Sequence, residues 1–371
     1  MRFEFDEEHY EFAAVVGDAL TRHAGARLVR GLWEGSADGS SLVDALVELG
    51  VTGLTVPSEH GGAGLAVSDC ILVLEQLGTH LVPHPVAEGF AVVAPLLLRH
   101  ADDGVSGRLL AGIASGELTA TVQDGWSGWA PWARSADVVA VVLDDAVVLT
   151  TPKSEHVEVL DGVDASRRLG RVSASAPHIE ILGPSAGSEA RQRATIMTSS
   201  LLVGVAFGMV DAAVDYAKVR NQFGRPIGSF QAVKHLLANA FTAVEASRRT
   251  AWWASLAVDA DAPDANEAVS VAKATIGEAA EQASNAALQV HGGIGYTWEC
   301  DLQLWMKRTQ ALQGSWGNAD EHLGALERIY AEARDDVGSD HGRAVAQGAS
   351  GQRTEGALPS TPAAAAAGTS S

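Results

Sequence analysis

The sequence has few cysteines, few basic residues and no long apolar run, and each shortage excludes a class of protein. Only two cysteines, Cys70 and Cys300, occur among 371 residues, which excludes a small scaffold held together by disulfides. Lysine and arginine number 26 against 46 acidic residues, and the resulting charge of -20 would repel a phosphate backbone and anionic lipid headgroups. We therefore expect neither nucleic acid nor a membrane surface as a partner.

Targeting, membrane-spanning, metal and nucleotide-hydrolysis signals are also missing. The first residues, MRFEFDEEHYEF, lack the charged-then-apolar layout of a secretory signal, so we expect a cytoplasmic protein. The richest apolar stretch runs from Ala91 to Leu98 and stops at Arg99, whereas a membrane helix needs roughly 20 apolar residues. No cluster of His, Cys and carboxylates has ligand spacing, and no G-x-x-x-x-G-K-[ST] loop occurs. Neither a metal site nor nucleotide hydrolysis is expected.

What is present is the composition of an ordinary globular protein, with 47% hydrophobic and 19% charged residues. Apolar positions recur every three or four residues up to about residue 114, which predicts helices. Short β-rich runs follow from about 118 to 182, namely LTATV, ADVVAVVL, DAVVLTT, HVEVL and HIEIL. Long helical patterns return from about 188. The sequence predicts an α+β fold with four parts. They are an N-terminal α-helical domain (1–116), a small middle β domain (117–184), a C-terminal four-helix bundle (185–336) and a disordered tail (337–371).

The first segment that indicates function is VRNQFGRPIGSFQ, which runs from Val219 to Gln231. Gly and Pro break a predicted helix here and a second helix follows. Two guanidinium groups, on Arg220 and Arg225, lie beside the free N–H groups of a helix end, and this combination suits a diphosphate. Taken alone, an Arg at a helix end is more often a solvated cap.

The second segment is QVHGGIGYTWE, residues 289–299, in which glycines follow a predicted helix and would let a backbone approach a ligand. His291 stands among apolar neighbours and is expected to be a packed residue. A Gly-Gly pair after a helix usually only ends it. The joint occurrence of the two segments, about 70 residues apart, favours a binding role over two separate helix ends.

Together the two segments resemble the paired signatures of the acyl-CoA dehydrogenase superfamily, flavoproteins that oxidise an acyl-CoA thioester to its trans-2-enoyl form. The resemblance extends over about residues 5–335 and implies FAD as the cofactor. It implies that one set of residues contacts the diphosphate and adenosine side of FAD and a second set its adenine half. The first set is Arg220, Gln222, Phe223 and Gln231, and the second is Gln289, Gly292 and Gly293. In that family these residues reach the FAD of a neighbouring subunit, so an oligomer is implied.

The sequence departs from the family where the catalytic base should stand. The family's glutamate lies in a Tyr-Glu-Gly-Thr stretch, but residues 315–318 read Ser-Trp-Gly-Asn, which places Trp316 at the glutamate's position. An indole cannot accept a proton at neutral pH. Some members carry the base near the position of Ala194, and no acid occurs there either. No catalytic residue is therefore assigned. The β region is also shorter than the family's and lacks the stretches that flank the isoalloxazine ring.

The chain keeps the residues that would contact the FAD of a neighbouring subunit, but it lacks the base and the isoalloxazine-flanking stretches of its own site. In this respect it looks like the base-lacking subunit of actinobacterial heteromeric acyl-CoA dehydrogenases. This resemblance implies a heterotetramer with a homologous subunit that supplies the catalytic Glu. It also implies an acyl-CoA substrate and an electron-transferring flavoprotein as acceptor. Two alternatives stay open: a self-sufficient enzyme with Glu299 or Glu321 as a displaced base, and a non-catalytic scaffold. Steroid, branched and straight acyl chains all remain possible substrates.

Overall fold

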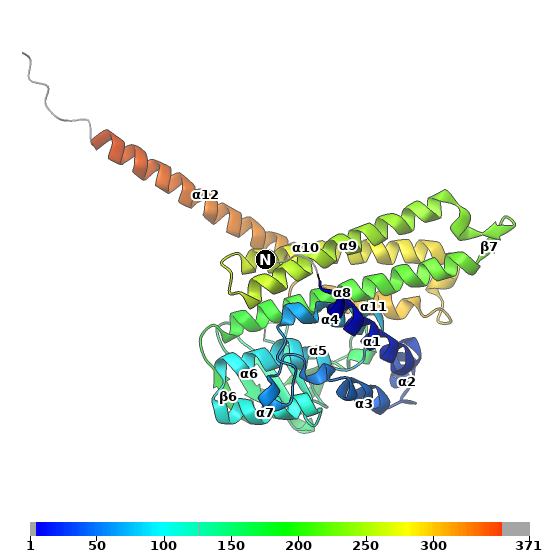
Figure 1. The fold of residues 1–371 in the computed structure, drawn as a ribbon, viewed down its shortest axis with the longest axis horizontal. Coiled ribbons are helices and arrows are strands. Elements are labelled where there is room, and N and C mark those ends of the chain that lie inside the picture. Colours follow the sequence, from blue (N-terminus) through cyan, green and yellow to red (C-terminus); the bar gives the residue numbers. More distant parts are fainter. Residues whose placement is uncertain (1–4, 126, 351–371) are drawn as a thin grey trace, which may run out of the picture. The chain divides into compact units, whose positions relative to one another are not determined.

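The computed structural model describes residues 5–125 and 127–350, and side chains up to 334. The chain forms two compact units, Met1–Leu326 and Glu327–Ser371. The first unit contains a helical N-terminal part, a small sheet and a helical C-terminal part, as the sequence predicted (Figure 1). Helix α7 ends at Ser115, strand β1 begins at Ala120 and helix α8 begins at Ala186. These transitions are close to residues 116/117 and 184/185, which we keep as predicted domain boundaries.

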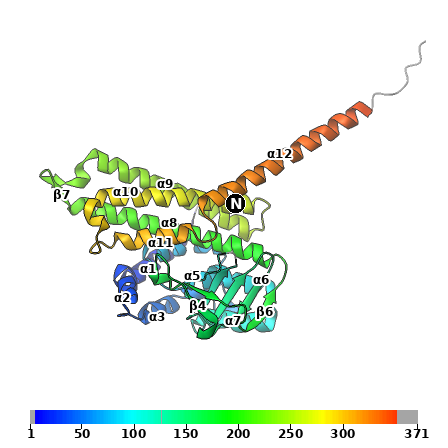
Figure 2. The same cartoon turned by 180° about the vertical axis from the view of Figure 1, so that it is seen from behind.

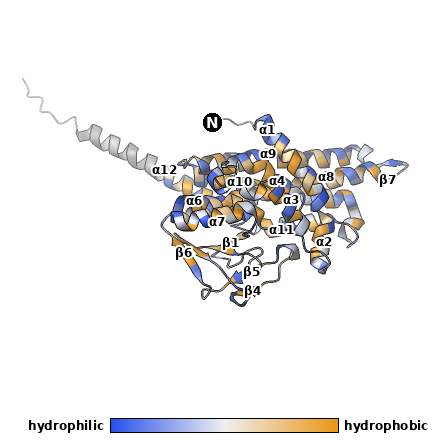
Figure 3. Cartoon of the chain, turned by 60° about the horizontal axis from the view of Figure 1, so that its bottom comes forward, coloured by the Kyte–Doolittle hydropathy of each residue, from blue (hydrophilic) through white to orange (hydrophobic). Residues whose placement is uncertain are grey.

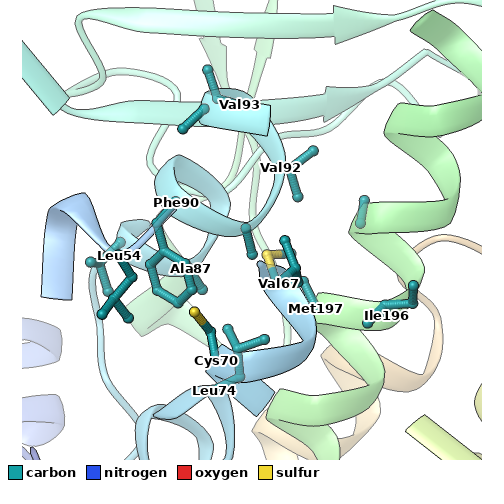
Figure 4. Close-up of a cluster of buried hydrophobic side chains, with 14 of the residues drawn as sticks. Leu54, Val67, Cys70, Leu74, Ala87, Phe90, Val92, Val93, Ile196 and Met197 are labelled. Carbon is teal, nitrogen blue, oxygen red and sulfur yellow. The ribbon is translucent and has the colours of Figure 1, made fainter. Parts of the chain in front are cut away.

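The N-terminal part is built from helices around an apolar core. Phe90 is completely buried in this core and lies beside Leu54 and Cys70 (Figure 4). Phe90 belongs to a π-helical turn, η4 (Gly89–Val93), which joins α5 to α6 in one helical stretch. The α-helices are α1 (Glu7–His23), α2 (Ala26–Glu34), α3 (Ser40–Glu48), α4 (Ile71–Thr79), α5 (Val86–Glu88), α6 (Ala94–His100) and α7 (Asp103–Ser115). The 3-10 turns are η1 (Val51–Gly53), η2 (Ser58–His60) and η3 (Val67–Cys70).

The middle part contains a four-stranded mixed sheet in the order β1-β2-β3-β6, with β1 parallel to β2 and the other pairs antiparallel. A separate antiparallel pair is formed by β4 and β5. Five of these six strands fall on the predicted β-rich runs, and β5, three residues long, was not predicted. The strands are β1 (Ala120–Asp124), β2 (Val138–Val142), β3 (Val147–Thr150), β4 (Val157–Val159), β5 (Gly170–Val172) and β6 (His178–Leu182). Figure 3 shows hydrophobic residues along β1 and β6.

The C-terminal part consists of α8 (Ala186–Val219), α9 (Gln231–Asp259), α10 (Ala265–His291) and α11 (Leu302–Gln313). Figures 1 and 2 show α8, α9 and α10 lying side by side, with the hairpin of β7 (Asn221–Gln222) and β8 (Arg225–Pro226) at one end. Helix α8 is apolar and long enough to cross a membrane, with a mean hydropathy of 1.7 in its most apolar window. Because 78% of that window is buried, α8 is the central core helix of this fold.

The N-terminal part is joined to the bundle by direct backbone contact between α4 and α8. A Cβ atom added at Gly204 would lie 1.9 Å from the carbonyl oxygen of Glu75, and one at Gly78 would lie 2.0 Å from that of Leu201. Only glycine allows two helices to approach this closely. The contact fixes α8 against the N-terminal part and therefore positions both ends of α8.

The predicted disordered tail is wrong for residues 337–350, because helix α12 runs from Ala319 to Ser350. Alanine, arginine and glutamine are good helix formers, and the first proline after Ala319 is Pro359, so a helix started at Ala319 can propagate. The rest of that tail, residues 351–371, lies outside the described residues.

Candidate functional site

The first predicted segment forms a β-hairpin at the end of α8. Strands β7 (Asn221–Gln222) and β8 (Arg225–Pro226) are joined by Phe223 and Gly224, which have φ angles of 52° and 79°. Positive φ at both loop positions matches the two-residue turn that suits the twist of a hairpin. Phe223 adopts this conformation despite its large side chain, and the residue is 92% exposed. A bulky residue in the left-handed region is strained, and such strain is concentrated at functional sites.

Arg220 and Gln231 bracket this hairpin. Arg220 follows the last residue of α8, and its backbone N–H donates to the carbonyl oxygen of Tyr216 at 2.9 Å. Its side chain is exposed, as are those of Gln222 and Gln231, the first residue of α9. The guanidinium of Arg225 lies over the ring of Phe230, 4.2 Å from its centroid. Arg225 is therefore engaged within the chain, whereas Arg220 is turned to solvent.

The second predicted segment ends α10 and enters the 3-10 turn η8 (Gly292–Tyr296). Gln289 is exposed on the last turn of α10. Gly292 has a φ of 63°, a conformation that favours glycine. A Cβ atom added at Gly292 or Gly293 would have no atom of the chain within 4 Å. The exposed backbone of these two glycines therefore leaves room for a group that does not belong to this chain.

The two segments lie at the same end of the bundle. The ring of Tyr216, in the last turn of α8, stacks on that of His291, the last residue of α10, with centroids 4.5 Å apart. The structure thus brings together two segments that are about 70 residues apart in the sequence. His291 is half-buried in this stack, as expected for a packed residue.

Trp316, which the sequence analysis predicts at the position of the family's glutamate, lies on the turn between α11 and α12. Trp316 has a φ of 60° and is half-buried. Its side chain lines a cavity of only about 20 Å³ together with Trp129 and Arg167. The carbonyl of Trp316 also accepts a hydrogen bond from Nε2 of His322, at 3.0 Å. The indole therefore fills the space between this turn and the sheet.

The side chains of Lys273 and Arg167 hold the turn that carries Trp316. The Nζ of Lys273, which is 1% exposed, donates to the carbonyl oxygens of Leu312 and Ser315, both at 2.7 Å. Burial, together with the nearby charge of Arg167, lowers the pKa of Lys273 from 10.5 to about 7. A neutral amine still has two hydrogens, which satisfy two carbonyls. Arg167 adds a hydrogen bond from Nη1 to the Oγ of Ser315 at 3.2 Å.

Arg167 also lies near a buried carboxylate, that of Glu88, which the sequence analysis missed. Glu88 lines a second cavity of about 30 Å³ with Arg167, Arg308 and His84. Burial raises the pKa of Glu88, and the Arg167 charge opposes this effect. Burial lowers the pKa of His84 to about 4, so its ring is neutral at pH 7. Glu88 is followed by glycine in an apolar run, and no local pattern indicates that it faces an arginine 79 residues later.

The two glutamates that were candidates for a displaced base are both exposed and line neither cavity. A hydrogen bond from the Thr297 side chain lowers the pKa of Glu299, which makes it a weaker base. Glu321 accepts a hydrogen bond from the backbone N–H of Asn318 at 2.7 Å and caps the start of α12. Their positions favour a structural role for both.

A groove of about 1430 Å³ lies away from both segments. Its lining comes mainly from α7, the start of β2 and the segment after β3. Three cations line it (Arg108, Arg134 and Lys153), and so do three acids (Glu117, Asp137 and Glu155). The balanced charge gives no preference for an anionic ligand. Among residues 5–125 and 127–334, no group of three His, Cys or acidic side chains could hold a metal ion.

Comparison with known proteins gives two family matches. The model for the acyl-CoA dehydrogenase N-terminal domain matches residues 6–117, and that for the C-terminal domain matches residues 189–331. Acyl-CoA dehydrogenase FadE34 of Mycobacterium tuberculosis is 34% identical over 338 residues, which cover 86% of this chain and 47% of FadE34. The chain therefore spans about half the length of that relative.

Acyl-CoA dehydrogenase IpdE2 of Mycobacterium tuberculosis is 33% identical over 307 residues, covering 81% of this chain and 91% of IpdE2. Among solved structures, the ChsE4-ChsE5 complex from the same organism contains a chain with the same fold. Its TM-score is 0.80 at 22% identity, covering 90% of this chain and 99% of that one.

Proposed function

Because the chain belongs to the acyl-CoA dehydrogenase family, we propose that it is one subunit of a heteromeric, FAD-dependent acyl-CoA dehydrogenase. It lends part of the FAD site to a homologous partner, and the partner supplies the catalytic Glu. The observation that carries this proposal is a contrast within the chain. The predicted FAD residues are exposed together at one bundle end, whereas the two cavities beside Trp316 and Glu88 hold only about 20 and 30 Å³.

The residues at the bundle end fit a dinucleotide. Arg220 offers a free guanidinium, which can pair with a diphosphate through two hydrogen bonds. Gln222, Gln231 and Gln289 add exposed amides that can both donate and accept. Gly292 and Gly293 leave their backbone accessible to a group from outside the chain. Bound there, FAD would supply the hydride acceptor for the β carbon of the acyl group, and the partner would supply the carboxylate for the α proton.

The closed interior supports the loss of the chain's own reaction site. Small-molecule pockets usually enclose about 300–1,000 Å³, far more than either cavity between the sheet and the bundle. Trp316 stands where a proton acceptor would be needed, and an indole cannot take that role. The turn that carries it is tied to Lys273 and Arg167, so the closure does not depend on the indole alone.

Apolar side chains at the same end of the bundle support a protein partner. Val219 at the end of α8 and Phe223 on the hairpin are 72% and 92% exposed. Tyr296, the last residue of η8, and Trp298 are 78% and 50% exposed. Tyr and Trp are enriched in protein interfaces and often dominate their binding energy. In this proposal a homologous dehydrogenase subunit covers them in a cytoplasmic heterotetramer that passes electrons to an electron-transferring flavoprotein.

The proposal is tested by expressing the chain alone and together with a homologous acyl-CoA dehydrogenase subunit from its genome neighbourhood. We expect FAD, measured by its visible spectrum, to appear in the co-expressed complex with fewer flavins than chains. The chain alone should be colourless and should not reduce an electron acceptor with acyl-CoA. A yellow homomer that turns over acyl-CoA would refute the proposal.

A substitution separates a shared flavin site from a scaffold. Arg220→Ala should lower the FAD content of the complex, because it removes the free guanidinium. Arg108→Ala serves as the matched control, because Arg108 is also exposed but lies on α7. A complex that keeps its full FAD content after Arg220→Ala would favour the scaffold. Native mass spectrometry of both variants checks that the assembly stays intact.

A further inference from the structure

The stack of Tyr216 on His291 joins the two segments that the proposed function assigns to FAD. Tyr216 is one helical turn before Arg220, and its carbonyl accepts the hydrogen bond from the Arg220 N–H. His291 directly precedes Gly292. The two rings are nearly parallel, with an interplanar angle of 19° and centroids 4.5 Å apart. The stack therefore links the end of α8, which carries the first segment, to the end of α10, which carries the second.

The ring of His291 is held by its own helix as well as by the stack. Its Nδ1 lies 2.8 Å from the carbonyl oxygen of Ala287. Because a carbonyl only accepts, Nδ1 carries the hydrogen, and Nε2 is the acceptor in the neutral ring. The turn after it also folds back closely, since a Cβ atom added at Gly295 would lie 3.1 Å from the Cβ of His291. His291 therefore presents one fixed face to Tyr216.

The hairpin of the first segment has few anchors of its own, whereas the second segment is also held at Trp298, whose carbonyl accepts a hydrogen bond from Nη2 of Arg30 at 2.7 Å. The hairpin has two residues in each strand, and a two-stranded hairpin is marginally stable on its own. Its connection to the bundle runs through the bond from the Ile227 N–H to the Arg220 carbonyl, at 2.8 Å, and through Gly228. A Cβ atom added at Gly228 would lie 3.0 Å from the carbonyl oxygen of Ala217, so this contact also rests on the last turn of α8. Helix α8 thus carries the hairpin, and the position of its end matters.

We infer that Tyr216 and His291 are positioning residues, whose stacked rings set the spacing between the Arg220 hairpin and the Gly292–Gly293 turn. The inference rests on the proposed function, since this spacing matters for FAD only if both segments contact the same molecule. Neither side chain needs to touch the cofactor. The stack keeps the guanidinium of Arg220 and the backbone of the glycine turn at a distance that one dinucleotide can span.

The spacing can be measured directly with two spin labels in the full chain. Asn221→Cys and Ile294→Cys place labels on exposed positions of the hairpin and of η8, outside the assigned residues. Cys300, which is half-buried, is changed to Ser, and the buried Cys70 stays. Pulsed electron paramagnetic resonance should show a narrow distribution of the distance between the two labels, and this distribution should broaden with Tyr216→Ala or His291→Ala. Tyr216→Phe and His291→Phe keep a stacked ring and should restore it.

The FAD content of the unlabelled complex is the second measurement. Tyr216→Ala and His291→Ala should weaken FAD binding about tenfold, which corresponds to about 1.4 kcal/mol, and the Phe variants should recover it. If Tyr216→Ala lowers the yield, Tyr216→Leu keeps an apolar side chain and tests the same point.

The two measurements separate two kinds of failure. Unchanged distances in both Ala variants would overturn the inference, even if Arg220→Ala still releases FAD. Broadened distances with unchanged FAD binding would confirm that the stack sets the spacing. That second result would refute the assignment of the two segments to FAD.

Discussion

The close crossing of α4 and α8 makes Gly204→Ala a demanding test of the structure. The new Cβ would lie 1.9 Å from the Glu75 carbonyl oxygen and 2.7 Å from its carbonyl carbon. Real Cβ contacts essentially never fall below 3.0 Å, so the two helices must move apart by about 1 Å. The obstacle is backbone, which cannot rotate away as the end of a flexible side chain could.

The expected cost follows from two opposing effects. Overpacking a well-packed core typically costs about 1–3 kcal/mol, and a backbone clash belongs at the upper end of that range. Replacing glycine by alanine within a helix returns about 0.5–1 kcal/mol. We therefore expect Gly204→Ala to lower the free energy of unfolding by about 2 kcal/mol. Urea unfolding followed by circular dichroism measures this as a lower midpoint at an unchanged slope.

Gly277→Ala is the matched control, because Gly277 is also a buried glycine inside a long helix, α10. A Cβ atom there would meet the Cβ of Ala319 at 3.4 Å, an ordinary contact. This variant should be neutral or more stable by up to about 1 kcal/mol. If Gly204→Ala unfolds at the same urea concentration as the unmodified chain, the described crossing of α4 and α8 is wrong.

The remaining predictions concern the closed interior. Lys273 binds its proton more weakly in the folded chain (pKa about 7) than in the unfolded chain (10.5), so its contribution to stability should increase as pH rises from 7 to 10.5. Urea unfolding at several pH values should show this slope, and Lys273→Met should abolish it; an identical slope in the variant would contradict the assignment. Trp316→Glu should not give the isolated chain acyl-CoA turnover, because the cavity beside it holds only about 20 Å³. Glu88→Gln should leave the turnover of the heteromer unchanged, and a loss of more than about tenfold in kcat would instead make Glu88 a catalytic base.

Local patterns predicted most of the fold. Helical periodicity located the long helices, and β-rich runs located five of the six strands of the middle part. Strand β5 was missed because Gly170-Arg171-Val172 is too short to show alternation. The prediction that disorder begins at residue 337 is wrong for residues 337–350, where α12 continues. A helix that has already started propagates through residues that would not start one.

The candidate site likewise contains features that the sequence predicts and features that depend on tertiary packing. The two glycine-containing segments were visible because each has a local pattern, and their meeting at one bundle end depends on helix lengths that the pattern also indicates. Arg167 and Lys273 could not be found from the sequence. They meet at the turn of Ser315 only through tertiary packing, and buried lysines are rare enough that no pattern predicts one.

The ring of Phe223 has a practical consequence for anyone who handles this protein. It stands at the tip of a hairpin, almost wholly in water, on a backbone conformation that aromatic residues avoid. A chain produced without a partner that covers this tip exposes an apolar side chain to non-specific association with other molecules in solution. Its yield and its aggregation should therefore depend on whether a partner is co-expressed. Phe223→Ser should reduce aggregation during storage.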